Sequence, residues 1–344
     1  MTMRKNFLFL VFLTVLSILT VFPGGALADS SLEPYLLPWE YDSVSEMAEA
    51  DGELHFFFMA SEGYVVSPGS STSEPEKWGD SCLVVFPNGQ LMLIDAGMPN
   101  YAPVLIENLH RLGVEKLDYL MISHPHDDHA GSVYAANGLP DHIEIGQAFV
   151  NGTYNGDWSE PKRLERVFEE HSIPWQAVSE GFTMDIGEVH LQVISPSPDI
   201  VGETLYTTPD VNNSSIVLRM DYKEFSALFT GDIYLVKEWD LTKNKADLLD
   251  VDLLKMPHHG NSTTSNSKDF ALAVSPALVV GTGHMAIESM TYYYYTKQGA
   301  KVLFDYCDGY IHAFTDGIEL NWEHSRERAT DYYDKFEYEN LKGK

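Results

Sequence analysis

The chain has 344 residues, of which 44% are hydrophobic and 12% aromatic, so it can fill the core of one large domain or two small ones. Its 22 basic and 51 acidic residues give a formal net charge of −29. No basic stripe interrupts this acidic excess, which argues against a nucleic acid as the favoured partner. The two cysteines, Cys82 and Cys307, exclude a disulfide framework; they either pair in an oxidising compartment or remain buried thiols.

Residues 1–28 are predicted to be a secretory signal peptide. Arg4 and Lys5 form a basic start, residues 7–22 form an apolar run, and Ala26-Leu27-Ala28 supplies a small-residue cleavage site. A membrane anchor is the alternative, because the apolar run is long for a signal core, but the Pro-Gly-Gly segment before the site favours cleavage. Cleavage removes two positive charges and no acid, which takes the net charge from −29 to −31. The expected product is secreted and has no stable membrane insertion.

Beyond residue 28, strand-like runs alternate with helical ones. The runs predicted as strands are 54–60, 81–87, 90–95, 117–123, 143–150, 189–194, 215–220, 225–230, 251–256, 277–280, 301–304, 310–314 and 318–322. The runs predicted as helices are 101–112, 161–171, 237–249, 267–274 and 288–298, and the long loops are 63–79, 152–160 and 195–209. The mixture predicts an α/β (α+β) fold in which two sheets pack face to face with helices outside. It assigns residues 29–322 to one domain and 323–344 to a charged C-terminal tail or a peripheral helix.

Polar side chains follow four of the strand-like runs. They are Asp95, the loop His124-Pro125-His126-Asp127-Asp128-His129, Asp232, and the pair His258-His259. Strand ends that feed loops on one rim of a sheet are where ligand sites usually assemble. Neutral imidazole and carboxylate hold divalent transition metals such as zinc, and one site takes three or four of them. The density of ligands in the histidine loop therefore predicts two metal ions rather than a polar surface loop.

The order and spacing of these motifs resemble the metallo-β-lactamase superfamily over roughly residues 50–322. The resemblance implies a four-layer αββα sandwich of two mixed β-sheets flanked by helices. The implied ligands are His124 and His126 for the first metal, Asp128, His129 and His259 for the second, and Asp232 as a bridge between them. The resemblance also implies that Asp95 supports the loops without binding metal and that His258 packs beside the site.

One departure from the superfamily pattern narrows the function. Many members place a third first-site histidine before the bridging aspartate, whereas the only histidine in that part of this chain is His190, in the middle of a strand-like run. The expected position carries Asp-Val-Asn-Asn-Ser-Ser at residues 210–215, so Asn212 or Asn213 faces the incomplete first site, or water fills it. This variant resembles the nuclease-like domain of DNA-uptake competence proteins and a secreted phosphorylcholine esterase, both of which break phosphoester bonds.

These resemblances imply a secreted, binuclear metal-dependent hydrolase that cleaves a phosphodiester by metal-activated hydroxide. Asp128 or Asp232 would orient the water, and His284 is a candidate acid for the leaving group, with an ordinary loop histidine as the alternative. The cofactors would be two divalent metal ions, Zn²⁺ or alternatively Mn²⁺. The expected substrate is a small-molecule or cell-surface phosphoester, while the net charge disfavours nucleic acid.

Two other functions stay open. One is hydrolysis of a lactone, amide or β-lactam on the same scaffold, against which the absent third histidine counts. The other is a non-catalytic metal-binding module, against which the nearly complete ligand set counts.

Overall fold

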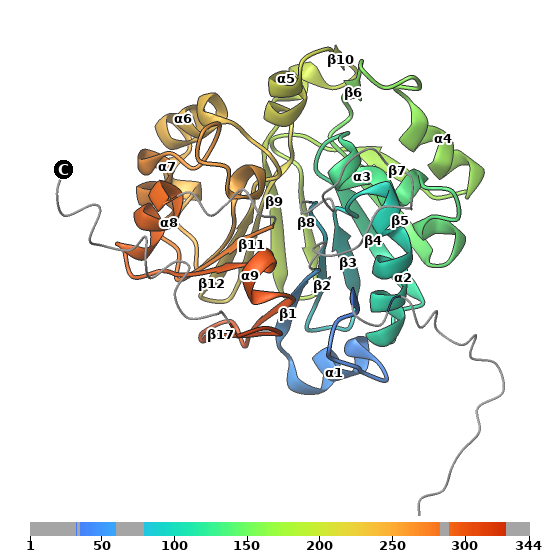
Figure 1. Cartoon of the computed structure of the whole chain (residues 1–344), viewed down its shortest axis with the longest axis horizontal. Coiled ribbons are helices and arrows are strands. Elements are labelled where there is room, and N and C mark those ends of the chain that lie inside the picture. Colours follow the sequence, from blue (N-terminus) through green and yellow to red (C-terminus); the bar gives the residue numbers. More distant parts are fainter. Residues whose placement is uncertain (1–31, 33–34, 60–78, 283–288, 328–344) are drawn as a thin grey trace, which may run out of the picture.

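The computed structural model describes residues 32, 35–59, 79–282 and 289–327. Two large mixed sheets stand face to face at the centre of the molecule (Figure 1). The first has the strand order β17 (Leu320–His324), β16 (Ile311–Thr315), β1 (Leu54–Phe58), β2 (Cys82–Val85), β3 (Leu91–Ile94), β4 (Lys116–Ile122), β5 (Glu144–Val150) and β7 (Trp175–Ala177). The second has the order β15 (Lys301–Phe304), β14 (Leu278–Gly281), β13 (Leu253–Lys255), β12 (Phe225–Phe229), β11 (Val217–Tyr222), β9 (Val189–Ser195) and β8 (Thr183–Ile186). A short parallel pair joins β6 (Tyr154–Asn155) to β10 (Thr204–Leu205).

The side chains of β1 show how a strand serves two cores. Phe56 and Phe58 point into the space between the sheets, where each ring lies 6.0 Å from the ring of Phe229 in the opposite sheet. Phe57 points the other way, into a second core beneath the helices. Because alternate residues of a strand face opposite sides, a strand that is buried along its whole length must be covered on both faces.

Helices supply that cover on the outer face of each sheet. The first sheet is covered by α1 (Val44–Asp51), α2 (Ala102–Arg111), α3 (Asp127–Tyr134) and α4 (Arg163–Glu170), and the second by α6 (Leu235–Asn244), α7 (Lys268–Val274) and α8 (Ser289–Thr296). Figure 1 shows α2, α3 and α4 on one side of the paired sheets and α6, α7 and α8 on the other. The fold is therefore a four-layer αββα sandwich, which confirms the predicted fold class.

The parallel parts of the sheets bring the predicted ligands to one edge. In the first sheet β3, β4 and β5 run parallel, and in the second β12 to β15 run parallel. The loops that carry Asp95 and the predicted ligands follow β3, β4, β12 and β13, at the carboxyl ends of parallel strands, where ligand sites of such sheets lie. The amide of Ile216, before β11, donates to the carbonyl of Ser123, after β4, at 2.9 Å, and this bond fastens the two sheets together beside the site.

Several predicted elements differ from the observed ones. The histidine loop is shorter than predicted because α3 already begins at Asp127. A further helix, α5 (Thr208–Asn213), occupies residues that were predicted as loop and as the approach to a strand. The side chain of Thr207 caps α5 by accepting from the amide of Asp210. A threonine followed three residues later by an acid is a helix-start signal that the sequence does contain.

The cysteines and the ends of the chain can also be compared with the sequence predictions. Cys82 is a buried free cysteine, and Cys307 lies in the short helix α9 (Asp305–Asp308), with its side chain outside the described part. Strand β17 continues to His324, so the first residues of the predicted tail belong to the sheet. The signal peptide, His284 and residues 328–344 lie outside the described residues. No helix within the described ranges has the length and apolar character needed to cross a membrane.

Candidate metal centre

The turn from β4 into α3 brings His124, His126 and His129 close together. The ring nitrogens His124 Nε2 and His126 Nδ1 lie 3.0 Å apart, and the ring centroids of His124 and His129 lie 4.2 Å apart. Burial is the main cause that lowers the pKa of both His124 and His126. Both imidazoles are therefore neutral near pH 7, which is the form that binds metal.

Loops from the second sheet close the site from the other side. Asp232 Oδ2 lies 3.2 Å from His129 Nε2 and 3.1 Å from His259 Nε2, and Asp128 Oδ2 lies 3.1 Å from His259 Nε2. The loop to Asp232 can pass this closely because residue 231 is glycine: a Cβ there would lie 2.7 Å from the side chain of Ser215. The structure thus brings together all the ligands that the sequence predicted: His124, His126, Asp128, His129, Asp232 and His259.

The charges of the cluster fit divalent cations. Burial lowers the pKa of His129, but the carboxylates of Asp232, Asp95 and Asp80 outweigh burial and hold that pKa well above its usual value. Burial likewise opposes the ionisation of Asp232, but the neighbouring imidazoles hold its pKa well below the usual range. Enclosed carboxylates therefore require positive charge beside them. Metal ions can supply that charge in place of imidazole protons, which metal binding releases.

Three buried polar atoms support the same interpretation. Among the described residues, His129 Nε2, Asp232 Oδ1 and Asn212 Oδ1 are enclosed and make no hydrogen bond, although His129 Nε2 lies 3.2 Å from Asp232 Oδ2 and the Lys255 ammonium lies 3.8 Å from Asp232 Oδ1. Buried polar atoms nearly always have a partner, and an ion is one of the ordinary explanations when protein supplies none. The donor set of imidazole, carboxylate and amide oxygen fits divalent metal ions, and the enclosed group Asp80, His129, Asp232 and His259 is a candidate metal site.

Asp95 lies behind the ligands, in the supporting position that the resemblance implies. Its Oδ2 lies 2.8 Å from His129 Nδ1, the ring nitrogen opposite the one that faces Asp232. The amide and the hydroxyl of Ser123 donate to its two carboxylate oxygens at 2.7 and 2.8 Å. A carboxylate in this place fixes the orientation of a metal-binding imidazole.

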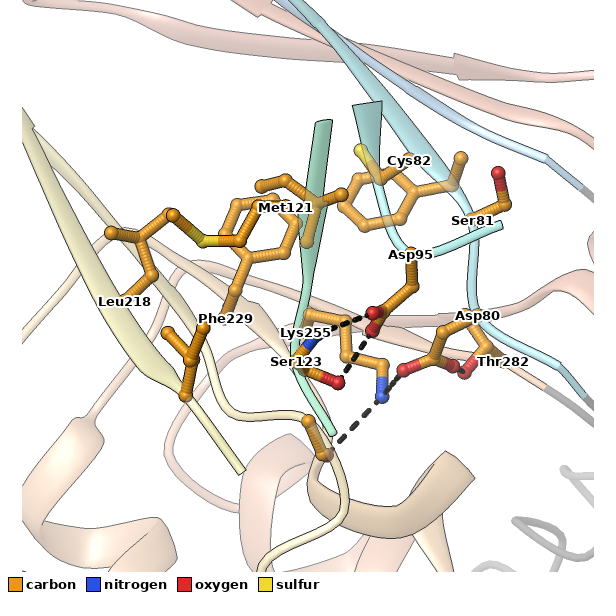
Figure 2. A pocket seen from close by; sticks show the side chains of 14 residues that line it. Asp80, Ser81, Cys82, Asp95, Met121, Ser123, Leu218, Phe229, Lys255 and Thr282 are labelled. Carbon is orange, nitrogen blue, oxygen red and sulfur yellow. Dashed lines mark hydrogen bonds and ion pairs between the residues drawn. The ribbon is translucent and has the colours of Figure 1, made fainter. Parts of the chain in front are cut away.

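Asp80 is a second supporting carboxylate, and the sequence analysis missed it. Its Oδ1 lies 3.1 Å from His259 Nδ1 and accepts a hydrogen bond from Thr282, while its other oxygen forms an ion pair with Lys255 (Figure 2). Four potential ligand atoms, from Asp80, His129, Asp232 and His259, lie within 4.8 Å of one another. Since His259 turns Nε2 to the metal ligands and Nδ1 to Asp80, we assign Asp80 to the support of His259.

Lys255 links this support to the bridging carboxylate. Its ammonium lies 3.8 Å from Asp232 Oδ1 and is almost fully enclosed, like Asp80. Figure 2 shows the lysine reaching toward Asp80, beside apolar side chains such as Phe229 and Met121. The lysine ammonium also donates to the carbonyl of Gly231 at 3.4 Å. A lysine inside an otherwise apolar strand was the one sequence signal for this buried pair.

The remaining candidates fall outside the ligand set. His258 Nε2 is 3.9 Å from Asp232, while its ring stacks on Tyr234 at 4.9 Å and its Nδ1 lies 2.7 Å from Thr264 Oγ1. Both His258 and His259 have positive φ (47° and 54°), an uncommon conformation for these residues that is often found at functional sites. His190 is half exposed and pairs with Asp185, so it takes no part in the cluster.

The comparisons with known proteins agree with this geometry. The family model described as the metallo-beta-lactamase superfamily matches residues 77–284, and the chain belongs to this superfamily. It is 27% identical over 222 residues to ComE operon protein 3 of Bacillus subtilis (strain 168), and 29% identical over 211 residues to competence protein ComA of Neisseria gonorrhoeae. These alignments cover 59% and 60% of this chain but 26% of each relative, so the chain matches about a quarter of their length. The predicted likeness to competence proteins is confirmed.

Two further proteins are similar to this chain. The anti-Pycsar protein Apyc1 of Bacillus phage vB_BveM-Goe7 is 27% identical over 180 residues, which cover 49% of this chain and 66% of that protein. Among solved structures, the metallo-beta-lactamase fold protein YhfI from Bacillus subtilis aligns with a TM-score of 0.47 and 13% identity, over 73% of this chain and 96% of that one.

Proposed function

We propose that this protein is a secreted, binuclear metal-dependent hydrolase that cleaves a phosphodiester. The observation that carries the proposal is the position of Asp232, whose Oδ2 lies within 3.2 Å of Nε2 of both His129 and His259, beside the pair His124 and His126. Bound there, two metals would lower the pKa of a water between them and neutralise charge on the phosphoryl oxygens.

The chain's own carboxylates divide the remaining work. The side chain of Asp128 is 17% exposed and that of Asp232 is 2% exposed, so only Asp128 is open to an entering water. We therefore assign to Asp128 the orientation of the water and the acceptance of its proton, and to Asp232 the bridging position. His284 remains the candidate acid for the leaving group.

The substitution at the third-histidine position supports phosphoester chemistry over the alternatives. Residues 210–215 carry asparagines where many members of the superfamily place a histidine, and this variant resembles proteins that break phosphoester bonds. The likeness to competence proteins keeps single-stranded DNA as a second candidate substrate. The net charge of −29 favours a small-molecule or cell-surface phosphodiester, because a strongly acidic chain repels a polyanion.

Metal analysis combined with a substrate panel tests the proposal. The purified protein should hold two divalent ions per chain and hydrolyse a bis-aryl phosphate or an aryl phosphorylcholine faster than single-stranded DNA or nitrocefin. A chelator and the double variant His126→Ala, Asp232→Asn should each abolish this turnover, while the matched surface variant His190→Ala should keep it. Preferred nitrocefin or lactone hydrolysis would replace the phosphodiester assignment, and turnover unaffected by the double variant would favour a binding module.

The secretion part of the proposal has its own test. Expression of the full chain in a bacterial host with a working secretion pathway should release a mature protein that begins at Asp29. Full-length protein retained in the membrane fraction would instead support the N-terminal anchor.

A further inference from the structure

We propose that the side-chain oxygen of Asn212 is a ligand of the first metal and stands in for the missing third histidine. This inference rests on the two-metal centre of the proposed function. Asn212 is 1% exposed, and its Oδ1 has no hydrogen-bond partner among the described residues. An amide oxygen that leaves water without gaining a partner destabilises the fold, so its burial calls for a group that it can bind.

The backbone holds Asn212 beside the bridging carboxylate. The hydroxyl of Ser215 donates to the carbonyl of Asn212 at 2.7 Å and accepts from the amide of Asp232 at 3.0 Å. One hydroxyl group therefore separates the end of α5 from the backbone of the bridging residue. The next residue, Ser214, is fastened as well, because the side-chain amide of Asn151 donates to its carbonyl at 2.9 Å.

The side-chain oxygen of Asn212 is left without a protein partner within the described part of the chain. Because Asn212 is almost fully buried and its Oδ1 has no hydrogen-bond partner among the described residues, that oxygen is available to bind a metal ion.

The neighbouring asparagine is already engaged. Asn213 Oδ1 accepts a hydrogen bond from the amide of Tyr234 at 3.0 Å. Consecutive residues of a helix point about 100° apart, so α5 can turn only one of the two side chains toward the first metal. Of the alternatives that the sequence left open, the structure favours Asn212, and Asn213 becomes a matched control on the same helix.

The chemistry of an amide oxygen predicts how the two sites differ. An amide is neutral like imidazole, so the charge of the site is kept, but its oxygen is a harder and weaker ligand for zinc than an imidazole nitrogen. The second site has the imidazoles of His129 and His259 and the carboxylate of Asp128, and should therefore bind zinc more tightly than the first. We expect the two ions to load in that order.

Zinc binding by the metal-free full-length chain tests the inference. In competition with a chromophoric chelator, wild type should bind two ions. Asn212→Ala should bind one ion as before and the other about tenfold more weakly or worse. Asn213→Ala should bind both with wild-type affinity. Asn212→His should tighten the weaker site, since it restores the imidazole found in many members.

Thermal unfolding with and without zinc separates a ligand from a structural residue. Zinc should raise the melting temperature of Asn212→Ala less than that of wild type, whereas Asn213→Ala should start lower and gain the full zinc-induced shift. Should Asn212→Ala fail to fold, Asn212→Asp and Asn212→Leu make the same comparison: the aspartate keeps the oxygen and should hold two ions, and the leucine should hold one. Unchanged affinity and a full zinc shift in the variants without the oxygen would overturn the inference while leaving two metals in wild type. Fewer than two ions in wild type would overturn the two-metal centre itself.

Discussion

Two buried histidine clusters in this molecule differ in the carboxylates that face them. In the metal centre, His259 lies 3.1 Å from Asp232, whose side chain is 2% exposed. On the outer face of the first sheet, His312 lies 3.0 Å from Glu323, whose side chain is 49% exposed, and its ring stacks on Phe57 at 4.1 Å. Burial lowers the pKa of His312 to about 4, whereas the enclosed carboxylates raise that of His259 well above its usual value in spite of burial.

The difference shows what distinguishes a cation site from a packed pair. Water can solvate the carboxylate of Glu323, so that carboxylate does not require a positive charge from the protein. The enclosed carboxylate of Asp232 has no such solvent and requires a cation beside it. In the outer cluster, His55 Nδ1 lies 3.1 Å from His312 Nε2 and the neighbouring carboxylates of Asp51 and Glu323 are partly exposed, whereas the inner cluster encloses its carboxylates and is the candidate metal site.

Replacing one residue in each cluster should give the largest difference between the two clusters. The loss of a residue behind a ligand typically weakens metal binding by about 10–100-fold. Because Asp232 is itself a predicted ligand, we expect Asp232→Asn to weaken metal binding by more than this and to abolish turnover. His312→Gln should keep both ions, because this residue faces a solvated carboxylate and the imidazole of His55 rather than an enclosed carboxylate. Metal content after gel filtration, measured together with phosphodiester turnover, checks both. Two ions and full turnover in Asp232→Asn would remove the distinction between the clusters.

The buried pair Lys255–Asp80 should give the next largest effect. Lys255→Met leaves the enclosed carboxylate of Asp80 without its partner, and breaking one half of a buried ion pair costs about 3–5 kcal/mol. Adding Asp80→Asn to Lys255→Met should recover most of that loss, because no buried charge is then left alone. Urea unfolding of the zinc-loaded proteins measures these differences. A single variant that loses less than about 1 kcal/mol would show that water reaches the pair.

Whether a site residue could be predicted depended on its position along the chain relative to the other site residues and to the apolar strands. The histidine loop could be found because its ligands are contiguous, and Asp232 and His259 could be found because each follows an apolar strand. Asp80 could not, since it reaches His259 across 179 positions and no local pattern marks it. Asn212 and Asn213 could not be separated from the sequence, because the backbone conformation decides which of two consecutive side chains turns toward the site.

The same reasoning applies to the fold. The strand runs were predicted close to their observed ends because their apolar residues are continuous and their turns contain Gly and Asn. Helix α3 was missed because its first turn holds metal ligands rather than an amphipathic pattern, and its buried residues include His129 and Gly131. The polar sequence of α5 concealed it in the same way.

A smaller effect is expected in the pH dependence of stability, where His312 is the residue that titrates. An unfolded histidine has a pKa near 6.5, and burial lowers that of His312 to about 4. Between these values only the unfolded chain binds the proton, so the stability that His312 contributes above about pH 6.5 should be lost as the pH falls toward 4, by about 3 kcal/mol in all. Urea unfolding of wild type and His312→Gln across this range measures the effect. Taking the difference between the two proteins cancels the metal loss that both share, and parallel curves would contradict the assignment.

The smallest effect is expected at His190, which belongs to neither cluster. It is not buried, and the carboxylate that it faces is not enclosed. His190 Nδ1 lies 2.6 Å from Asp185, closer than the 2.8 Å between His129 and Asp95 in the metal centre, but the two side chains are 48% and 73% exposed. An exposed ion pair contributes about 0–1 kcal/mol, because water solvates both groups and the side chains lose conformational freedom. His190→Ala should therefore change the free energy of unfolding by less than about 1 kcal/mol and leave the bound metal at two ions per chain. A larger loss, or a missing ion, would mean that proximity alone can make a histidine–carboxylate pair strong, and the distinction drawn from Asp232 and Glu323 would then fail.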